Sequence, residues 1–499
     1  MSVLEFIDSE VFNPVYGNDV PLVQNKNIIN ICKELQYAIR NKETIFIYGD
    51  YDMDGFSSMM VWRETLGALR APSPVLFHYQ NRMHNLDPDI IRQVKATDAR
   101  VVIICDTGSS LEDRRVLSML EMEGYTTIVI DHHTYIGDYA IECENRLTFN
   151  AYEERAALAH CDISGAYASA IVAKVLCEKF MDTPLPFNAK VFALASMYAD
   201  VVDMSSPLAR ALYNSVGIVN AKGPALFEEL NTWGYMYGRR FFSYIVIPKI
   251  NGCFRTEKFD LLNAVLDAKD KYKIRELCTQ MCEVHSYAKQ LSESLVGAFT
   301  RENYGDFVLC THTVTDETRM LHVRNFTGLI ATKVAQEEMT MAVVVTKDGT
   351  LYEGSYRDYH GRDMLDTFNL FCTAGGHPNA FGLSFNDIKQ FTRHLELISR
   401  QAQDSVEKQT VFMNSGVIES DEDYNALALY NEYMNTRPRV IISHICSDTK
   451  LVRATAHSKY YKVGLAGDKT VMVTRPLTDG MKVMLEPAIC RGVELRELV

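Results

Sequence analysis

The sequence predicts an α/β protein whose first domain contains a doubly wound parallel sheet. Three short apolar runs, at residues 44–49, 100–105 and 126–130, have the length and the Ile and Val content of strands buried on both faces. Helical spacing occurs between these runs, and alternation of strands with helices indicates right-handed crossovers in such a sheet. Each run leads into Asp, so the carboxyl edge of the sheet is predicted to be acidic.

The helices around these strands follow from apolar spacing. Residues 27–40 place Ile28, Ile31 and Leu35 mostly on one face, which predicts a helix packed beside the first strand. Further along the chain we expect a helix at 55–69, a strand at 75–79, a crossover helix at 111–123, and helices at 164–180 and 208–219.

The second half of the chain changes its pattern twice. Residues 261–301 keep helical periodicity with no Pro or Gly before Gly297, which predicts one long bridging helix. Short strands at 307–310 and 341–345 flank a helix at 328–338, residues 401–436 look helical and acidic, and residues 437–499 look strand-like. The predicted units are a catalytic domain at 1–235, a connecting segment at 236–301, a smaller α/β domain at 302–400, and a helical linker with a β domain at 401–499.

Length and composition favour a large soluble enzyme. The 499 residues suggest about three domains, and the chain has no apolar run of 18 residues that would span a membrane. The first residues lack the basic and then apolar pattern of a signal peptide, so we expect a cytoplasmic protein. The twelve Cys are scattered without a Cys-x-x-Cys pair, which fits a reducing compartment.

The formal charge of −13 argues against a broad, non-specific DNA-binding surface. It does not exclude a narrow basic channel, because an acidic metal site adds negative charge that bound metal would offset. Residues 437–499 hold 11 Lys and Arg against 6 Asp and Glu. Tyr460, Tyr461 and Lys462 place rings beside a cation, a composition that suits stacked bases. An ordinary β appendage with a chance basic excess is the alternative.

Three carboxylates follow the first strand at alternate positions, namely Asp50, Asp52 and Asp54. Anions this close repel one another unless a cation lies between them, and hard divalent cations bind carboxylate oxygen. Ligands in open α/β sheets gather beyond the carboxyl ends of the strands, where these residues fall. The sequence therefore predicts half of a metal site; an acidic turn or a helix cap is the plainer alternative.

The same design recurs downstream. Asp106 follows the second strand, Asp131, His132 and His133 follow the third, and Asp200 ends an apolar run at 193–199. Imidazole with several carboxylates suits manganese, and this number of acids would serve two ions. We interpret the set as a two-metal hydrolase of phosphate esters.

These segments resemble a known family. Asp-Tyr-Asp-Met-Asp-Gly at 50–55, Asp-Thr-Gly at 106–108, Asp-His-His at 131–133 and Ala-Asp-Val-Val at 199–202 are similar to the four signatures of the DHH phosphoesterase superfamily, and most of all to its RecJ branch. Residues 247–255, the Gly-Ser-x-Arg at 354–357 and the Gly-Gly-His at 375–377 resemble later RecJ and DHH-associated signatures. The resemblance runs from about residue 12 to about residue 385.

The resemblance implies a DHH domain, a long connecting helix, a smaller DHH-associated domain and a C-terminal OB-like β-barrel. It implies two Mn²⁺ ions, with Mg²⁺ as a substitute, and Asp106 as the ligand shared between them. Asp52 and Asp106 would hold one ion with help from Asp50. Asp54, Asp106, His132 and Asp200 would hold the other.

The remaining site residues are assigned by the same resemblance. Asp131 would orient His132 or brace its loop, and His133 would protonate the leaving oxygen or contact the phosphate. Substrate phosphates would be bound by a further set: Asn251, Arg255, Arg357, Gly375, Gly376 and His377. The Gly-Gly-His segment is expected to form a tight turn. The plainer interpretation of this segment is an ordinary turn that carries a surface His.

The implied function is a Mn²⁺-dependent exonuclease that degrades single-stranded DNA in the 5′→3′ direction during repair, recombination or replication. Its expected partners are single-stranded DNA and, further, single-strand-binding protein or a helicase. One alternative is a phosphodiesterase of short oligonucleotides or cyclic dinucleotides. An alternative of another class is an inactive DNA-binding replication scaffold, which is disfavoured because no metal-binding acid is missing.

Overall fold

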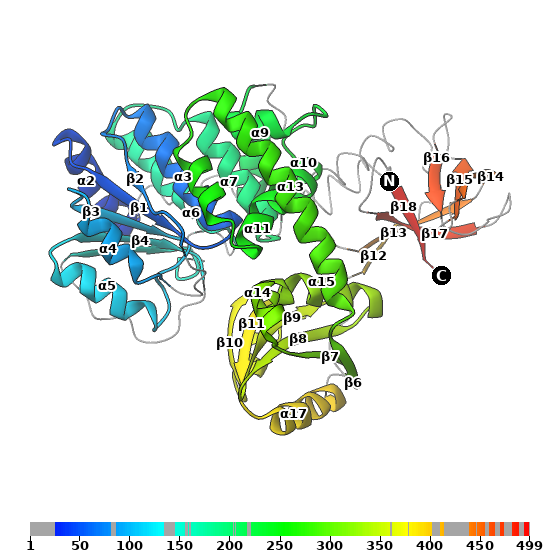
Figure 1. Ribbon diagram of the computed structural model, residues 1–499. Helices are drawn as coiled ribbons and strands as arrows, with labels where there is room; N and C mark the ends of the chain where they lie inside the picture. Colours follow the sequence, from blue (N-terminus) through cyan, green and yellow to red (C-terminus); the bar gives the residue numbers. More distant parts are fainter. Residues whose placement is uncertain are drawn as a thin grey trace.

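The computed structural model describes residues 25–80, 86–133, 145–154, 158, 161–202, 204, 206–216, 221–359, 362–377 and 379–401, and the strands β12–β18 between residues 410 and 498. Figure 1 shows two α/β units joined by a long helix, with the C-terminal strands at one side. The first unit is the sheet β1–β5 with its helices, and the second unit is the sheet β6–β11 with its helices.

The sheet of the first unit is entirely parallel and has the order β2-β1-β3-β4-β5. Its strands are β1 (Ile45–Gly49), β2 (Val75–Leu76), β3 (Val101–Cys105), β4 (Thr126–Asp131) and β5 (Arg146–Asn150). The order reverses direction between β1 and β3, which makes their carboxyl ends the topological switch point of a doubly wound sheet. The predicted fold class is therefore confirmed.

Helices cover both faces of this sheet (Figure 1). α2 (Lys26–Arg40), α3 (Met53–Ala68) and α6 (Gly165–Val175) lie on one face, and α4 (Asp89–Lys95) and α5 (Asp113–Met122) lie on the other. α7 (Phe187–Ala199) packs on α3 and α6, and α8 (Pro207–Val216) packs on α7. The predicted helix at 27–40 is confirmed.

Two predicted boundaries in this unit are wrong. α3 begins at Met53 and not after Gly55, because the Asp52 carboxylate accepts hydrogen bonds from the N–H groups of Asp54 and Gly55 and so caps the helix earlier. β2 spans two residues and not 75–79, because its pairing with β1 covers only Phe46 with Val75 and Ile47 with Leu76.

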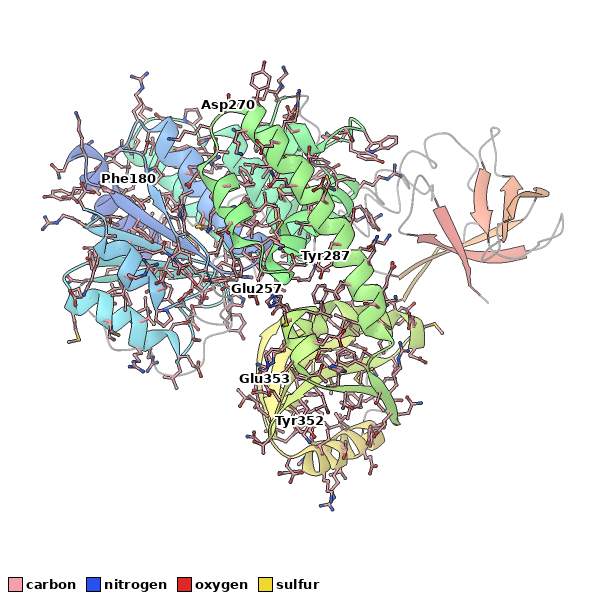
Figure 2. The ribbon with its side chains drawn as sticks, viewed as in Figure 1. Phe180, Glu257, Asp270, Tyr287, Tyr352 and Glu353 are labelled. Atoms are coloured by element: carbon pink, nitrogen blue, oxygen red, sulfur yellow. The ribbon has the colours of Figure 1, made fainter. Side chains whose placement is uncertain are left out.

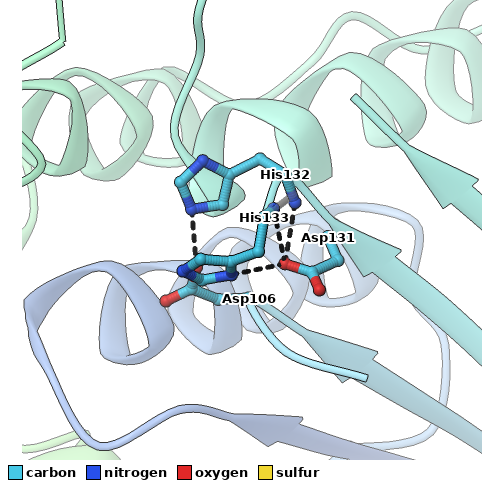
Figure 3. A group of neighbouring side chains, drawn as sticks. All are labelled: Asp106, Asp131, His132 and His133. Carbon is cyan, nitrogen blue, oxygen red and sulfur yellow. Dashed lines mark hydrogen bonds and ion pairs between the residues drawn. The ribbon is translucent and has the colours of Figure 1, made fainter. Parts of the chain in front are cut away.

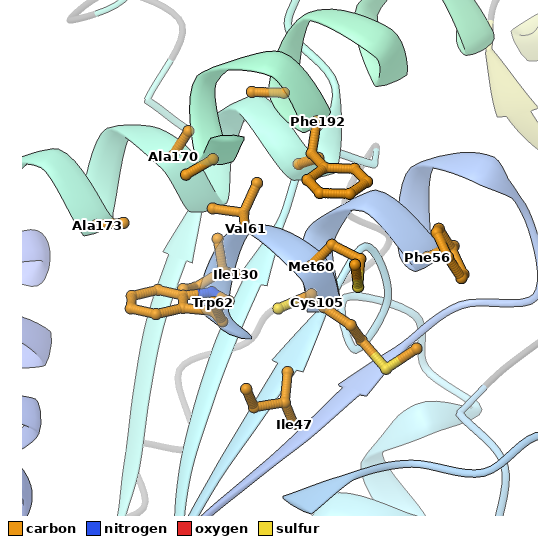
Figure 4. Packing of buried hydrophobic residues seen from close by; sticks show 14 of the residues in the cluster. Ile47, Phe56, Met60, Val61, Trp62, Cys105, Ile130, Ala170, Ala173 and Phe192 are labelled. Carbon is orange, nitrogen blue, oxygen red and sulfur yellow. The ribbon is translucent and has the colours of Figure 1, made fainter. Parts of the chain in front are cut away.

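α3 is buried on all sides, which explains why its apolar residues are not confined to one stripe. Figure 4 shows Met60, Val61 and Trp62 of α3 lying between Ile130 of the sheet and Phe192 of α7. Trp62 is fully buried. One core of buried residues runs from Ile28 to Met281, so it includes helices well beyond residue 235. The predicted domain boundaries at 235, 301 and 400 stay predictions.

Several helices connect the two units. They are α9 (Ala225–Leu230), α10 (Arg239–Phe241), α11 (Ile247–Arg255), α12 (Phe259–Asp267) and α13 (Lys271–Val296). The single helix predicted at 261–301 is wrong in extent, because Ala268 has extended backbone and Asp270 caps a new helix by accepting a hydrogen bond from Lys273 N. α13 nevertheless bridges the units, since Leu277 lies in the first core and Leu291 in a second one.

The second unit contains a mixed sheet of order β10-β11-β9-β8-β7-β6. Its strands are β6 (Thr300–Tyr304), β7 (Phe307–Thr313), β8 (Met341–Asp348), β9 (Leu351–Asp358), β10 (Thr373–His377) and β11 (Ala380–Phe385). Its helices are α14 (Asp316–Met320), α15 (Thr327–Glu338), α16 (Leu365–Phe368) and α17 (Ile388–Gln401). The predicted Gly-Gly-His turn is wrong, because these residues form the edge strand β10 and pair with β11 along its whole length.

The C-terminal region forms two small sheets, β12-β13-β17-β18 and β14-β15-β16. Their strands are β12 (Thr410–Met413), β13 (Arg439–Ile445), β14 (Ser447–Ala454), β15 (Lys459–Gly464), β16 (Thr470–Val473), β17 (Lys482–Ala488) and β18 (Glu494–Leu498). Of the helix predicted over 401–436, residue 401 ends α17, and β12 contradicts the prediction at residues 410–413. Residues 402–409 and 414–436 lie outside the described residues. The strand-rich tail is confirmed, whereas its closure into an OB-like barrel stays a prediction.

Among the helices that the structure describes, none combines the length and the apolar character needed to cross a membrane.

Candidate metal centre

The first signature loop is held by backbone hydrogen bonds from a distant helix. Asp54 lies in the first turn of α3, and its two carboxylate oxygens accept hydrogen bonds from Gly165 N (2.6 Å) and Ala166 N (2.8 Å). These N–H groups belong to the first turn of α6, where unpaired N–H groups favour an anion. The small residues at the start of α6 therefore bind a protein carboxylate.

Gly165 also makes room for Asp106. A Cβ atom at Gly165 would lie 2.6 Å from Asp106 Oδ1, which is closer than any real contact allows. Asp106 itself follows β3 with a φ of 62°, a conformation that Asp tolerates better than most residues. The close approach brings the ends of β3 and α6 together, and with them Asp106 and Asp54.

His132 lies among three carboxylates. Its Nε2 is 3.0 Å from Asp106 Oδ1, 3.4 Å from Asp200 Oδ2 and 3.6 Å from Asp54 Oδ2. The side chains of His132, Asp54 and Asp106 are 1–4% exposed. Asp200 caps the C-terminal end of α7, so four separate elements of the first unit supply this cluster. The structure thus brings together Asp54, Asp106, His132 and Asp200, as the sequence predicts.

Asp131 braces the neighbouring His (Figure 3). Its Oδ1 accepts hydrogen bonds from His132 N (2.7 Å) and His133 N (3.3 Å) and lies 2.8 Å from His133 Nδ1, while Oδ2 accepts from Ser109 N. Asp131 therefore fixes the loop and the His133 ring. The predicted alternative is that Asp131 orients the His132 ring. Among the described residues, no hydrogen bond between Asp131 and that ring supports it.

The pKa values of the two imidazoles are shifted in opposite directions. Burial, and then the nearby charge of His133, lowers the pKa of His132 to about 4. Burial also disfavours the charged form of His133, but the carboxylate of Asp131 outweighs it and raises the pKa of His133 to about 9. His132 is therefore neutral at neutral pH, which is the form that binds metal, and His133 carries a proton.

The carboxylates carry more negative charge than the protein alone can offset. Burial, and then repulsion from Asp54 and Asp52, raises the pKa of Asp106 and that of Asp200 well above the ordinary value. The pKa of Asp52 is also raised, by burial and by Asp54. Asp200 Oδ2 is buried and accepts no hydrogen bond within the described part of the chain. A divalent cation would relieve both the repulsion and the unmet acceptor.

Within the described residues, two groups of side chains have donor atoms close enough to hold one ion. One comprises Asp106, Asp131, His132 and His133, and the other comprises His132, Asp200 and His377. The mixture of carboxylate oxygen and imidazole nitrogen fits a divalent transition metal such as Mn²⁺. Three N–H groups already surround Asp131 Oδ1, and His133 carries a proton, so we assign neither residue as a ligand. The candidate ligands in these two groups are Asp106, His132, Asp200 and His377. The residues present therefore fit a divalent cation.

The second unit contributes His377 and Arg357 to the same region. His377 Nε2 lies 3.9 Å from Asp200 Oδ2, and its ring centroid lies 5.6 Å from that of His132. Arg357 on β9 pairs with Ala380 on β11, which in turn pairs with His377 on β10, so the two side chains occupy one row across the sheet. Burial lowers the pKa of Arg357 to about 10, which leaves it cationic at neutral pH.

The other predicted substrate residues are placed less directly. Asn251 on α11 accepts a hydrogen bond from Met53 N (3.0 Å), so its side chain holds the first turn of α3. The backbone oxygen of Arg255 accepts from Asn325 of the second unit. Gly375 and Gly376 lie on β10, where Gly376 has a φ of 132° that L side chains rarely adopt. Substrate binding by all these residues stays a prediction.

Several bracing residues escaped the sequence analysis. Tyr79 donates its hydroxyl to Asp50 O (3.1 Å), and Asn150 donates to both Ser109 Oγ (2.7 Å) and His133 O (3.2 Å). Asp113 accepts from the N–H groups of Gly108 and Ser110 beside Asp106. Of these residues, Asp113 alone could have been predicted from the sequence, because Ser110 and Asp113 have the Ser-x-x-Asp spacing of a capping box.

Comparison with known proteins agrees with this arrangement. Residues 44–199 match the family described as "DHH family, N-terminal domain". The three signatures that follow strands lie within this segment, and the fourth, with Asp200 at the end of α7, begins at its last residue. This segment of the chain thus resembles the N-terminal domain of the DHH family.

The chain is also similar in sequence to proteins named as single-strand DNA exonucleases. It is 21% identical over 460 residues to the single-stranded-DNA-specific exonuclease RecJ of Bacillus subtilis (strain 168), covering 86% of this chain and 56% of that protein. It is 25% identical over 405 residues to the putative SPbeta prophage-derived single-strand DNA-specific exonuclease YorK of Bacillus subtilis (strain 168), covering 73% of this chain and 67% of that protein. The chain thus spans little more than half of the first relative.

A solved structure shows the same fold. The crystal structure of RecJ in complex with Mn²⁺ from Thermus thermophilus superposes with a TM-score of 0.75 and 17% identity, and the match covers 99% of this chain and 73% of that one.

Proposed function

We propose that the protein is a metal-dependent nuclease that hydrolyses phosphodiester bonds of single-stranded DNA from the 5′ end. The observation that carries the proposal is the pairing of a buried, metal-fitting cluster on the first unit with cationic Arg357 and with His377 on the facing row of the second unit. A phosphate bound between them would contact metal on one side and positive or donating groups on the other. The relatives named as single-strand DNA exonucleases support the choice of substrate.

We assign two divalent cations, preferably Mn²⁺, to the cluster. Asp52 and Asp106 would hold one with help from Asp50, and Asp54, Asp106, His132 and Asp200 would hold the other. When bound, such ions offset the charge of the phosphodiester and activate a water for in-line attack. The protein keeps the ligands in place beforehand: two backbone N–H groups fix the Asp54 carboxylate, and close packing against Gly165 fixes Asp106.

His133 is the group that we propose to protonate the leaving oxygen. Its Nδ1 lies 2.8 Å from Asp131, which directs the second ring nitrogen, Nε2, away from the carboxylate. Its side chain is 36% exposed, whereas that of His132 is 4% exposed, so His133 is the one within reach of a substrate. A pKa of about 9 keeps it protonated at neutral pH, as a general acid requires.

The second unit would grip the strand. Arg357 offers two N–H groups to one phosphate oxygen pair, and His377 can donate to an oxygen of the same phosphate. Arg255, Asn251, Gly375 and Gly376 are proposed to line the approach, with the glycines allowing the backbone of β10 to come close to the strand. The C-terminal strands would extend the contact away from the metals. Single-strand-binding protein or a helicase as a partner stays a prediction.

A phosphodiesterase of short oligonucleotides or cyclic dinucleotides is the second candidate, because it would use the same two units. The seven described strands beyond residue 409 favour the exonuclease, since a short substrate would not need them. An inactive DNA-binding scaffold is disfavoured, because every acid of the proposed metal site is present and Asp54, Asp106, His132 and Asp200 converge.

The test uses pure protein, Mn²⁺ and DNA labelled at either end. We expect single strands of roughly 10 to 60 nucleotides to be shortened from the 5′ end, duplexes to resist, and Asp200→Asn to be inactive. Cleavage of dinucleotides or cyclic dinucleotides with long strands left intact would move the function to the second candidate. A variant lacking residues 437–499 should bind long strands more weakly, with a shallower dependence on salt, because phosphate contacts are lost.

A further inference from the structure

The side chain of His377, on the second unit, makes a polar contact with a candidate ligand of the metal centre. Its Nε2 lies 3.9 Å from Asp200 Oδ2, and Asp200 Oδ2 lies 3.4 Å from His132 Nε2. The rings of His377 and His132 are tilted at 49° with centroids 5.6 Å apart. Three donor atoms from two units thus surround one small volume.

Two of the donor separations around this volume match a coordination sphere. Imidazole nitrogen and carboxylate oxygen lie about 2.0–2.2 Å from a divalent cation of this size, so two donors to one ion are separated by up to about 4.2 Å. The separations of 3.4 and 3.9 Å fall below this limit, and all three donors lie within 4.8 Å of one another. Without an ion, Asp200 Oδ2 has no hydrogen-bond donor among the described residues.

The position of His377 differs from that expected of a residue that contacts only the substrate. It ends the edge strand β10, directly after Gly376 with its φ of 132°. Within the described residues, its contact with Asp200 is the one polar contact of its side chain. In Figure 1, β10 lies at the edge of the second sheet that is nearest to the first unit.

The two units are otherwise joined on the side of α13. That helix packs Met281 into the core of the first unit and Leu295 into the core under β7 and β8. Beside it, Asn325 of the second unit donates to Arg255 O (3.2 Å) and Glu257 Oε1 (3.1 Å), and His322 lies 3.0 Å from Glu257. Figure 2 shows Glu257 and Tyr287 near this junction. These contacts tether the second unit at one place, and the contact between His377 and Asp200 lies at another.

We propose that His377 is a metal ligand supplied by the second unit, so that a divalent cation bound to His132 and Asp200 latches the second unit onto the first. Metal loading would then assemble the substrate site as well as activate it, because Arg357 lies in the same row as His377. The inference rests on the metal centre of the proposed function and is independent of which phosphodiester the protein cleaves.

The closing experiment measures metal coordination without any substrate. Full-length wild type, His377→Ala, His377→Gln and the control His394→Ala would be titrated with Mn²⁺, and nitrogen couplings to the bound ion would be counted by pulsed electron paramagnetic resonance. His394 is matched because it lies in the same unit and stacks on Phe371, away from the metal centre. Circular dichroism would confirm that each variant is folded.

We expect two coupled imidazole nitrogens in the wild type and the control, and one in both His377 variants. The Kd for this ion should rise by roughly tenfold, the lower end of the effect of losing a residue that supports a metal site. An unchanged nitrogen count in the His377 variants would overturn the proposal and leave His377 as a phosphate contact. Absence of any bound Mn²⁺ in the wild type would instead refute the metal centre itself.

Hydrogen exchange gives a second, independent readout of the latch. Mn²⁺ should slow amide exchange in peptides covering β10 and β11 by at least about threefold in the wild type and in His394→Ala. The same peptides should show no slowing in His377→Ala or in His132→Ala, which lack one side of the latch. Equal slowing in His377→Ala and the wild type would show that metal closes the units without this residue.

Discussion

The two halves of the site are built differently. On the first unit, Asp54, Asp106 and His132 are almost completely buried, and backbone N–H groups or close packing fix the two carboxylates. On the second unit, His377 is 39% exposed and stands on an edge strand. The first half is preorganised to hold charge, whereas the second half reaches the site only through the placement of a whole sheet.

This difference predicts two kinds of functional loss, one for substitutions in each half of the site. Losing a carboxylate of the buried half should remove the proposed metal and its chemistry together, and it should also remove electrostatic repulsion from the folded protein. Losing Arg357 of the exposed half should leave the buried half intact and weaken the hold on substrate. Substitutions on each side can therefore break or sharpen this contrast.

The largest effect is expected for Asp106→Asn, which removes the proposed shared ligand. Metal catalysis is worth several kcal/mol, and about 1.4 kcal/mol corresponds to a factor of ten, so kcat should fall by roughly 10³-fold or more. The metal-free variant should melt at a higher temperature than the metal-free wild type, because one repelled carboxylate is gone. Kinetics, Mn²⁺ titration and thermal melts with chelator check the prediction. Near wild-type turnover with normal Mn²⁺ binding would contradict the site.

A smaller effect is expected for Arg357→Gln on the exposed half. A hydrogen bond to a charged group contributes about 1.5–3 kcal/mol, so kcat/KM for single-stranded DNA should fall by about 10- to 100-fold. The affinity for Mn²⁺ should not change. Arg319→Gln is the matched control, since Arg319 pairs with Asp348 at the surface. If Arg357→Gln lost metal affinity to the same degree as activity, the contrast between the two halves would be wrong.

The stability of the metal-free protein should fall as the pH rises from about 6.5 to about 9. Asp106 and Asp200 have raised pKa values in the folded state, so folding retains protons that the unfolded chain releases above about pH 4. His133 adds to the trend, because its pKa is about 9 when folded and about 6.5 when unfolded. Its stabilising contribution is complete below about pH 6.5 and is lost as the pH passes about 9.

Melting temperatures measured in chelator at several pH values test this prediction. Saturating Mn²⁺ should flatten the dependence, because the cation stabilises the ionised carboxylates. His133→Asn should show a shallower decline over the same pH window than the wild type. A melting temperature that stays level or rises over this window would mean that the buried carboxylates are not under the predicted repulsion.

The smallest effect is expected for Tyr79→Phe. The variant keeps the ring contacts with Tyr51 and Phe254 and loses only the hydroxyl that binds Asp50 O. We expect a loss of about 1 kcal/mol in the free energy of unfolding and an increase of a few-fold in the Kd for Mn²⁺. Tyr287→Phe on the exposed middle of α13 is the control. Identical metal affinity in Tyr79→Phe and the wild type would show that the loop holds its ligands without this brace.

Much of the fold was predictable because it depends on local pattern. Buried parallel strands need continuous apolar runs, so β1, β3 and β4 stand out in the sequence. Their ends meet at one edge by the geometry of the sheet, so Asp54, Asp106 and His132 could be grouped without a structure. The errors in helix boundaries occurred where an Asp side chain caps a helix at a position that apolar periodicity does not indicate. Asp52 starts α3 before Gly55, and Asp270 starts α13 within the predicted long helix.

The sequence by itself determined which groups are available: an edge of carboxylates and imidazoles that fits a cation, followed by a second unit with Arg and His. Only the tertiary structure decided which groups meet. In the folded protein, N–H groups of α6 donate hydrogen bonds to Asp54, and Asp131 contacts the His133 ring. The Gly-Gly-His segment forms an edge strand that places His377 beside Asp200. Such pairings join residues far apart in the chain, and they depend on how whole elements pack, which no local pattern records.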